Sequence, residues 1–133
     1  MDAYEFNQLQ NKEFLELAFK IKLALGAFLL LALLDTWTLV ASLKVLSLLQ
    51  ALIGIVTVLA TFYTVAALWR ARGRLIRIAK TEGEDLSLLF RGTQHLENAF
   101  VSVTVAIIGH IVGTFTYHEM MYGPYAIFAT PPM

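Results

Sequence analysis

The sequence predicts an all-α integral membrane protein with three transmembrane helices, an N-terminal interfacial helix and an extended C-terminal tail. In the segment 23–69 the only formally charged residues are Asp35 and Lys44. Because about 20 apolar residues in a helix cross a bilayer core of about 30 Å, this segment holds two spans. A further apolar block, residues 99–117, adds the third. With 58% hydrophobic residues among 133, the whole chain, residues 1–133, is predicted to be a single membrane domain.

Charge and cysteine content exclude several classes of function. Ten basic residues balance ten acidic ones, for a formal net charge of zero, whereas a nucleic-acid-binding surface needs an excess of basic residues. The chain has no cysteine, which excludes disulfides, thiolate metal sites and cysteine nucleophiles. It also lacks the GxSxG, HExxH and P-loop motifs of common enzyme classes. We therefore predict a protein without catalytic residues of its own.

The lead segment, residues 1–20, begins polar and becomes amphipathic toward its end. Its apolar residues and those that follow recur at helical spacing: Phe14, Leu17, Ala18, Ile21 and Leu25. Charged residues, among them Glu16 and Lys20, take the other positions. This pattern predicts an interfacial helix that leads directly into the first span, with lysine side chains reaching the lipid headgroups.

The first span is predicted at about residues 21–40 and the second at about residues 45–69. Trp37 favours the outer interface, because indole rings concentrate at the level of the headgroups, and we place Asp35 there as well. A tight, partly embedded connection then joins the spans, and Asp35 is predicted to form an ion pair with Lys44 across it. In the alternative, the Asp35 carboxylate is buried in the bundle as a proton-binding site.

A basic cluster follows the second span directly. The loop of residues 70–97 begins with RARGRLIRIAK, and short loops rich in Lys and Arg stay on the cytoplasmic side of a membrane. We therefore place this loop and the N-terminus on the cytoplasmic (or matrix or stromal) side and the C-terminus on the opposite side. The second helix is expected to continue to about Lys80. A short amphipathic helix is then expected to lie on the inner face before the third span.

Three arginines of this cluster share one face of the predicted helix: Arg70, Arg74 and Arg77, spaced by four and three residues. Orientation of the chain in the membrane is sufficient to explain them. Contact with anionic lipid headgroups, each charge contributing on the order of 1 kcal/mol, is the second interpretation. It makes bound lipids expected ligands.

The third span, at about residues 98–118, contains Gly109 and Gly113 at the small-xxx-small spacing that allows helices to approach closely. It also contains His110 near its middle, where ionisable groups face protein or water rather than lipid. The remaining tail, residues 119–133, is apolar, aromatic and proline-containing. It is expected to be extended and to pack on the outer membrane face or on another subunit.

Three interpretations of His110 compete. In the favoured one, His110 forms a structural hydrogen bond to a neighbouring helix, where Thr57, Thr61 and Thr64 share one face and offer hydroxyl groups. In the second, His110 ligates a b-type haem, with the other axial ligand supplied by another chain or absent. In the third, it belongs to a proton or ion path.

His118, Glu119 and Met120 combine imidazole, carboxylate and thioether groups at the outer interface. Such groups suit copper among other metals, but neighbours along a helix point about 100° apart and cannot all converge. An interfacial polar cap is therefore the favoured interpretation of these residues. The sequence requires no cofactor, and haem and copper are the alternatives.

Together these features favour a small, non-catalytic accessory subunit of a larger multi-subunit membrane complex. Three helices with short connections bury little among themselves, and an apolar tail and a glycine-lined face suit neighbouring subunits. The expected partners are larger membrane subunits and anionic lipids, in an energy-converting assembly for electron transfer, photosynthesis or oxidation. The first alternative is a homo-oligomeric channel with His110 and the threonine face lining its pore. The second is a b-haem-binding membrane anchor subunit.

Overall fold

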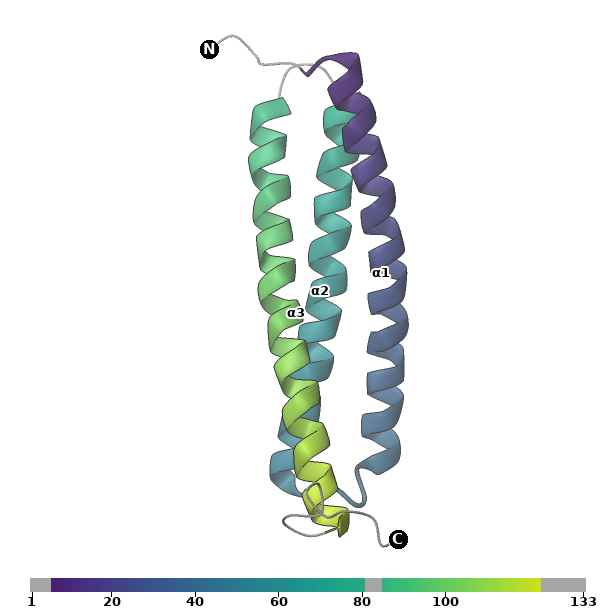
Figure 1. The fold of residues 1–133 in the computed structure, drawn as a ribbon, viewed down its shortest axis with the longest axis vertical. Coiled ribbons are helices and arrows are strands. Elements are labelled where there is room, and N and C mark those ends of the chain that lie inside the picture. Colours follow the sequence, from purple (N-terminus) through teal and green to yellow (C-terminus); the bar gives the residue numbers. More distant parts are fainter. Residues whose placement is uncertain (1–5, 81–84, 123–133) are drawn as a thin grey trace, which may run out of the picture.

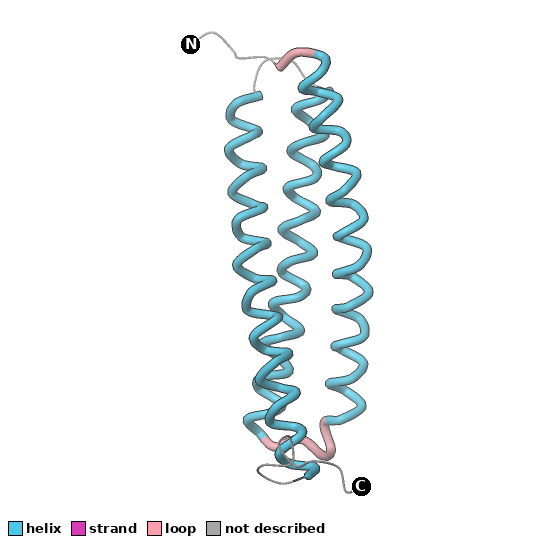
Figure 2. Tube along the Cα trace, in the orientation of Figure 1, coloured by secondary structure: helices cyan, strands magenta, loops and turns pink. Residues whose placement is uncertain are grey.

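Three long helices run side by side in alternating directions (Figure 1). The computed structural model describes residues 6–80 and 85–122, with side chains up to residue 116. Within these residues α1 spans Gln8–Ser42, α2 spans Leu48–Lys80 and α3 spans Asp85–Tyr122, and no strand is present (Figure 2). All three are long and apolar enough to cross a membrane. The prediction of an all-helical, multi-pass membrane protein is confirmed at this level.

The helices are longer than the predicted spans. α1 has 35 residues, which at 1.5 Å per residue gives a length of about 52 Å, well above the apolar thickness of a bilayer. α2 has 33 residues and α3 has 38, so their charged turns outside residues 23–69 and 99–117 are expected to extend beyond the apolar layer. Residues 8–20 are the first turns of α1 and lead without a break into the first predicted span, while their position at the membrane interface stays a prediction.

Local capping explains where α1 begins. The side chain of Asn7 accepts a hydrogen bond from the backbone N–H of Gln10, and the Gln10 side chain accepts one from the backbone N–H of Asn7, both at 2.9 Å. This reciprocal capping box satisfies two of the N–H groups that a helix start leaves unpaired. Nothing in the sequence interrupts the helix from there to Ser42.

The segment 85–97 differs from its prediction. We predicted a loop with a short amphipathic helix on the membrane surface, but these residues form the first turns of α3. Leu88 and Ala99 are both buried in the same apolar cluster, so the segment packs on the other helices instead of lying on a surface. At the other end of α3, residues 119–122 are helical, whereas residues 123–133 of the predicted extended tail lie outside the described residues.

The apolar core occupies the half of the bundle that contains the α2–α3 connection. Its buried members are Ala18, Ile21, Ala67, Leu68, Leu75, Ile78, Leu88 and Ala99. α2 is the central helix: backbone contacts join it to α1 and to α3, whereas α1 and α3 have none with each other over the described residues. The bundle is therefore well packed at one end and open between α1 and α3 toward the other.

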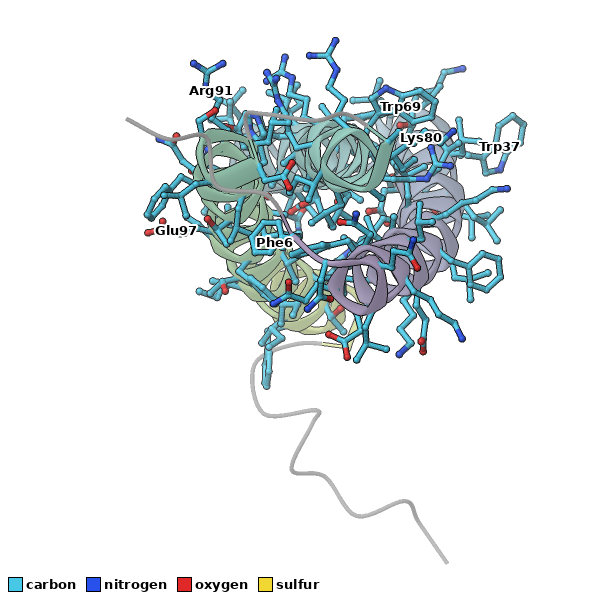
Figure 3. The ribbon with its side chains drawn as sticks, turned by 90° about the horizontal axis from the view of Figure 1, so that it is seen from above. Phe6, Trp37, Trp69, Lys80, Arg91 and Glu97 are labelled. Atoms are coloured by element: carbon cyan, nitrogen blue, oxygen red, sulfur yellow. The ribbon has the colours of Figure 1, made fainter. Side chains whose placement is uncertain are left out.

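A hydrogen bond closes the packed end. The backbone N–H of Phe6 donates to Oδ2 of Asp85 at 2.8 Å, and the Asp85 residue is only 2% exposed. Phe6 also packs edge-on against Phe14, with ring centroids 4.9 Å apart. Figure 3 shows Phe6 between the ends of α1 and α3. These contacts fix the start of α1 against the start of α3.

Large apolar side chains are exposed on all three helices. Large exposed side chains include Leu30, Trp37, Val56, Phe100 and Ile111. Trp37 points away from the bundle (Figure 3) and is 74% exposed. A surface of this kind is stable against lipid or protein rather than water.

Candidate functional site

Polar side chains from all three helices meet inside the apolar bundle. Nε2 of His110, from α3, lies 3.2 Å from Oδ2 of Asp35, from α1. The hydroxyl of Thr61, from α2, lies 3.4 Å from the same carboxylate oxygen and donates to the backbone carbonyl of Thr57 at 2.9 Å. The side chain of Asp35 is 12% exposed and that of His110 is 42% exposed. We call these three residues, Asp35, Thr61 and His110, the polar cluster.

Asp35 therefore contacts His110 rather than Lys44. The predicted ion pair assumed that α1 ends near Asp35, but the helix continues to Ser42. Asp35 then lies about two turns inside the helix, and its carboxylate faces α3. Lys44 is exposed. Asp35 therefore lies within the bundle and is partly buried, whereas its alternative role as a proton-binding site stays a prediction.

Close contact between α2 and α3 brings His110 to the centre of the bundle. A Cβ atom at Gly109 would overlap the hydroxyl of Thr57 and lie 3.2 Å from its Cβ, so only glycine fits without a shift. A Cβ atom at Gly113 would lie 3.9 Å from Cγ2 of Ile53, an ordinary contact. Of the two glycines, Gly109 is the one that the packing requires.

The threonine face of α2 points into the bundle. Thr57, Thr61 and Thr64 are all buried, and the Thr57 and Thr64 hydroxyls donate to backbone carbonyls one turn earlier at 2.8 and 2.9 Å. The hydroxyls of Thr64 and Ser102 lie 2.7 Å apart. Ser102 is not among the residues predicted from the sequence. Its spacing from Ala99, Ala106 and Gly109 marks a face of small residues on α3 that would have indicated it.

A groove opens beside the polar cluster, toward the connection at residues 43–47. Its volume is about 610 Å³, and residues of all three helices line it. Among its polar residues are Thr38, Ser42, Gln50 and Thr114. The amide of Gln50 donates to the backbone carbonyl of Thr116 at 3.1 Å, which ties the start of α2 to α3. We call this space the α1/α3 groove.

The polar cluster pairs an imidazole with a carboxylate but has few ligands for a metal. Nε2 of His110 is buried and makes no aligned hydrogen bond, although it lies within ion-pair distance of Asp35. Over the described residues no three side chains of His, Cys, Asp or Glu converge on one point. A haem iron bound at Nε2 would have to displace the Asp35 carboxylate, and the geometry gives haem ligation no support.

The other predicted site residues lie elsewhere. The side chains of His118, Glu119 and Met120 are outside the described part of the chain. Arg70, Arg74 and Arg77 lie on α2 near its end and line a second cavity together with His95. The 15 residues between His95 and His110 correspond to about 22 Å along α3, so these two imidazoles serve separate sites.

Comparisons with protein families, curated proteins and solved structures found no match to this chain.

Proposed function

We propose that this chain is a non-catalytic subunit of a larger membrane complex, and that the α1/α3 groove receives a transmembrane segment of a larger partner subunit. One observation carries the proposal: a groove of about 610 Å³, lined mostly by apolar surface but holding the side chains of Asp35, His110 and Thr114, opens between α1 and α3, whose backbones do not approach each other over the described residues. Polar groups facing hydrocarbon are costly, so such a surface is expected to be covered by protein.

The lining of the groove supports a helical partner. Gly113 lies along it, where an added Cβ atom would make only an ordinary 3.9 Å contact with Ile53, and a small residue allows a second helix to approach closely. The exposed part of the His110 ring and the hydroxyl of Thr114 offer polar contacts to that helix. The apolar core lies at the opposite end of the bundle, so the three helices hold together there while the groove stays available.

Charge distribution supports an orientation for the subunit. Basic residues of the α2 end, from Arg70 to Lys80, and those of the first turns of α1 belong to the same end of the bundle (Figure 1). By the positive-inside rule we propose that this end faces the cytoplasm, matrix or stroma. The α1/α3 groove then opens in the opposite half of the membrane.

Photo-crosslinking from inside the groove tests the proposal. A photoreactive residue at Thr114, in the groove, is expected to link the chain to one larger protein in native membranes. The matched control is Ile108, on the same helix and 55% exposed on a face turned away from the groove, and is expected to give no such product. Equal products from both positions would contradict the proposal.

A second candidate function is a homo-oligomeric proton path. The polar cluster favours it, because ionisable residues within membrane helices commonly mark ion or proton routes. In this case the Thr114 crosslink would yield a product of twice the mass of this chain. Proteoliposomes of the purified chain would conduct protons, and His110→Ala would abolish the flux.

A further inference from the structure

A second cavity, of about 460 Å³, lies on the flank of α2 and α3 beyond the apolar layer. Six residues line it: Trp69, Arg70, Gly73, Arg74, Arg77 and His95. The three arginines recur at helical spacing around Gly73, so their side chains leave one face of α2. A Cβ atom at Gly73 would meet nothing within 4 Å, and the space above this glycine is therefore open. We call this space the arginine cavity.

Packing of α3 on α2 brings His95 into the arginine cavity. A Cβ atom at Gly92 would lie 3.5 Å from the Cβ of Arg74, so the two helices are in direct contact at this point. His95 follows one turn later on the same side of α3. Burial, and then the positive charges of Arg70 and Arg74, hold the pKa of His95 below its usual value. The field in the cavity is accordingly positive.

Among the described residues, Arg70 and Arg74 have no carboxylate partner within 4 Å. Glu97 and Trp69 project from opposite sides of the bundle (Figure 3). An electropositive cavity with two guanidinium groups that have no carboxylate partner within the described ranges is suited to an external anion.

The position of the cavity along the bundle identifies the source of that anion. Trp69 is the last residue of the apolar part of α2, and it is 63% exposed. Indole rings at such a boundary typically lie at the level of the lipid headgroups. Arg70 follows it directly, so the arginine cavity lies where lipid phosphates are found. Guanidinium groups bind phosphate oxygens in bidentate fashion.

We propose that the arginine cavity binds the phosphomonoester headgroup of an anionic lipid, of the phosphatidic acid type. Converging guanidinium groups favour a phosphomonoester, which carries more negative charge and more free oxygens than a phosphodiester. A phosphodiester headgroup such as that of phosphatidylglycerol lies at the same level of the membrane, but its phosphate carries only one charge and a bulky substituent. This site is independent of the α1/α3 groove, and failure of either proposal leaves the other intact.

Lipid retention by native mass spectrometry tests the site. The purified chain in phosphatidylcholine nanodiscs is given equal amounts of phosphatidic acid or phosphatidylglycerol. We expect at least about tenfold stronger retention of phosphatidic acid, the factor that 1.4 kcal/mol of extra binding provides. Equal retention of the two lipids would overturn the proposal. Displacement of the lipid by inorganic phosphate at a comparable concentration would also overturn it, because the site would then bind free phosphate.

Three variants test whether lipid retention depends on the arginine cavity itself or only on the total positive charge of the chain. Arg74→Gln is expected to bring phosphatidic acid retention down to the level of phosphatidylglycerol. Arg91→Gln removes the same charge from an exposed position of α3 outside the cavity and is expected to leave retention unchanged. Gly73→Leu keeps every charge but fills the open space, and it is expected to abolish the preference. Equal losses in Arg74→Gln and Arg91→Gln, or an unchanged preference in Gly73→Leu, would contradict the proposal.

Discussion

His110→Ala is expected to lower the free energy of unfolding more than Asp35→Ala does. Loss of His110 leaves a carboxylate that is only 12% exposed, with the Thr61 hydroxyl at 3.4 Å as its remaining partner. A buried polar group without a partner costs about 1–3 kcal/mol, and more when it is charged. Loss of Asp35 leaves an imidazole that is 42% exposed to the groove, which is less costly. Unfolding of both variants by SDS in mixed micelles measures the difference.

The double variant shows whether the two residues act as a pair. We expect a coupling energy of about 0.6–1.7 kcal/mol between Asp35 and His110, the range from the average to the maximum that double-mutant cycles give for interhelical polar contacts in membranes. The matched control is Glu16 with Lys20, an ion pair at 2.9 Å within one helix whose side chains are 62% and 67% exposed. Its coupling is expected to be much smaller, since exposed pairs contribute little. Equal coupling in the two pairs would show that the contact between α1 and α3 is not energetically important.

Gly109→Ala is expected to destabilise the contact between α2 and α3. The added methyl group would overlap the Thr57 hydroxyl, and overpacking of this kind costs about 1–3 kcal/mol. The matched control is Gly113→Ala, whose methyl group would make an ordinary 3.9 Å contact with Ile53. That variant is expected to be neutral or slightly stabilising, because alanine is the better helix former. Thermal unfolding in detergent compares them.

A second-site change tests the physical reason for this effect. Thr57→Ala removes the hydroxyl that a methyl group at Gly109 would meet, while the Thr57 Cβ position at 3.2 Å remains. The Gly109→Ala/Thr57→Ala double variant is expected to recover part of the lost stability. Equal destabilisation by Gly109→Ala and Gly113→Ala would contradict a specific contact at Gly109.

The helices could be predicted from the sequence because apolar length alone decides whether a segment spans a membrane. Their ends could not. Charged residues at 85–97 suggested a separate surface helix, but that segment contains no break, and packing of residues such as Leu88 joins it to one continuous α3. Trp37 suggested an interface at Asp35, whereas the α1 helix continues for about two more turns.

The candidate site could be predicted only in part. The cost of an ionisable group in a membrane singled out His110, and helical spacing placed the threonines on one face. The choice of Asp35 as the partner of His110 depends on how α1 and α3 are placed relative to each other, which periodicity within one helix does not determine. The same holds for His95, which meets the arginines only because α3 packs against Arg74 at Gly92.

Purification of the tagged chain from its native membrane in a mild detergent is the most direct test of a partner in the α1/α3 groove. The native chain is expected to carry a larger membrane subunit in a fixed ratio. Gly113→Leu, which places a bulky side chain in the groove, is expected to lose that subunit while the chain remains helical and monodisperse. Recovery of the native chain alone, as a discrete monomer or homo-oligomer, would contradict the proposed role as a subunit of a larger complex.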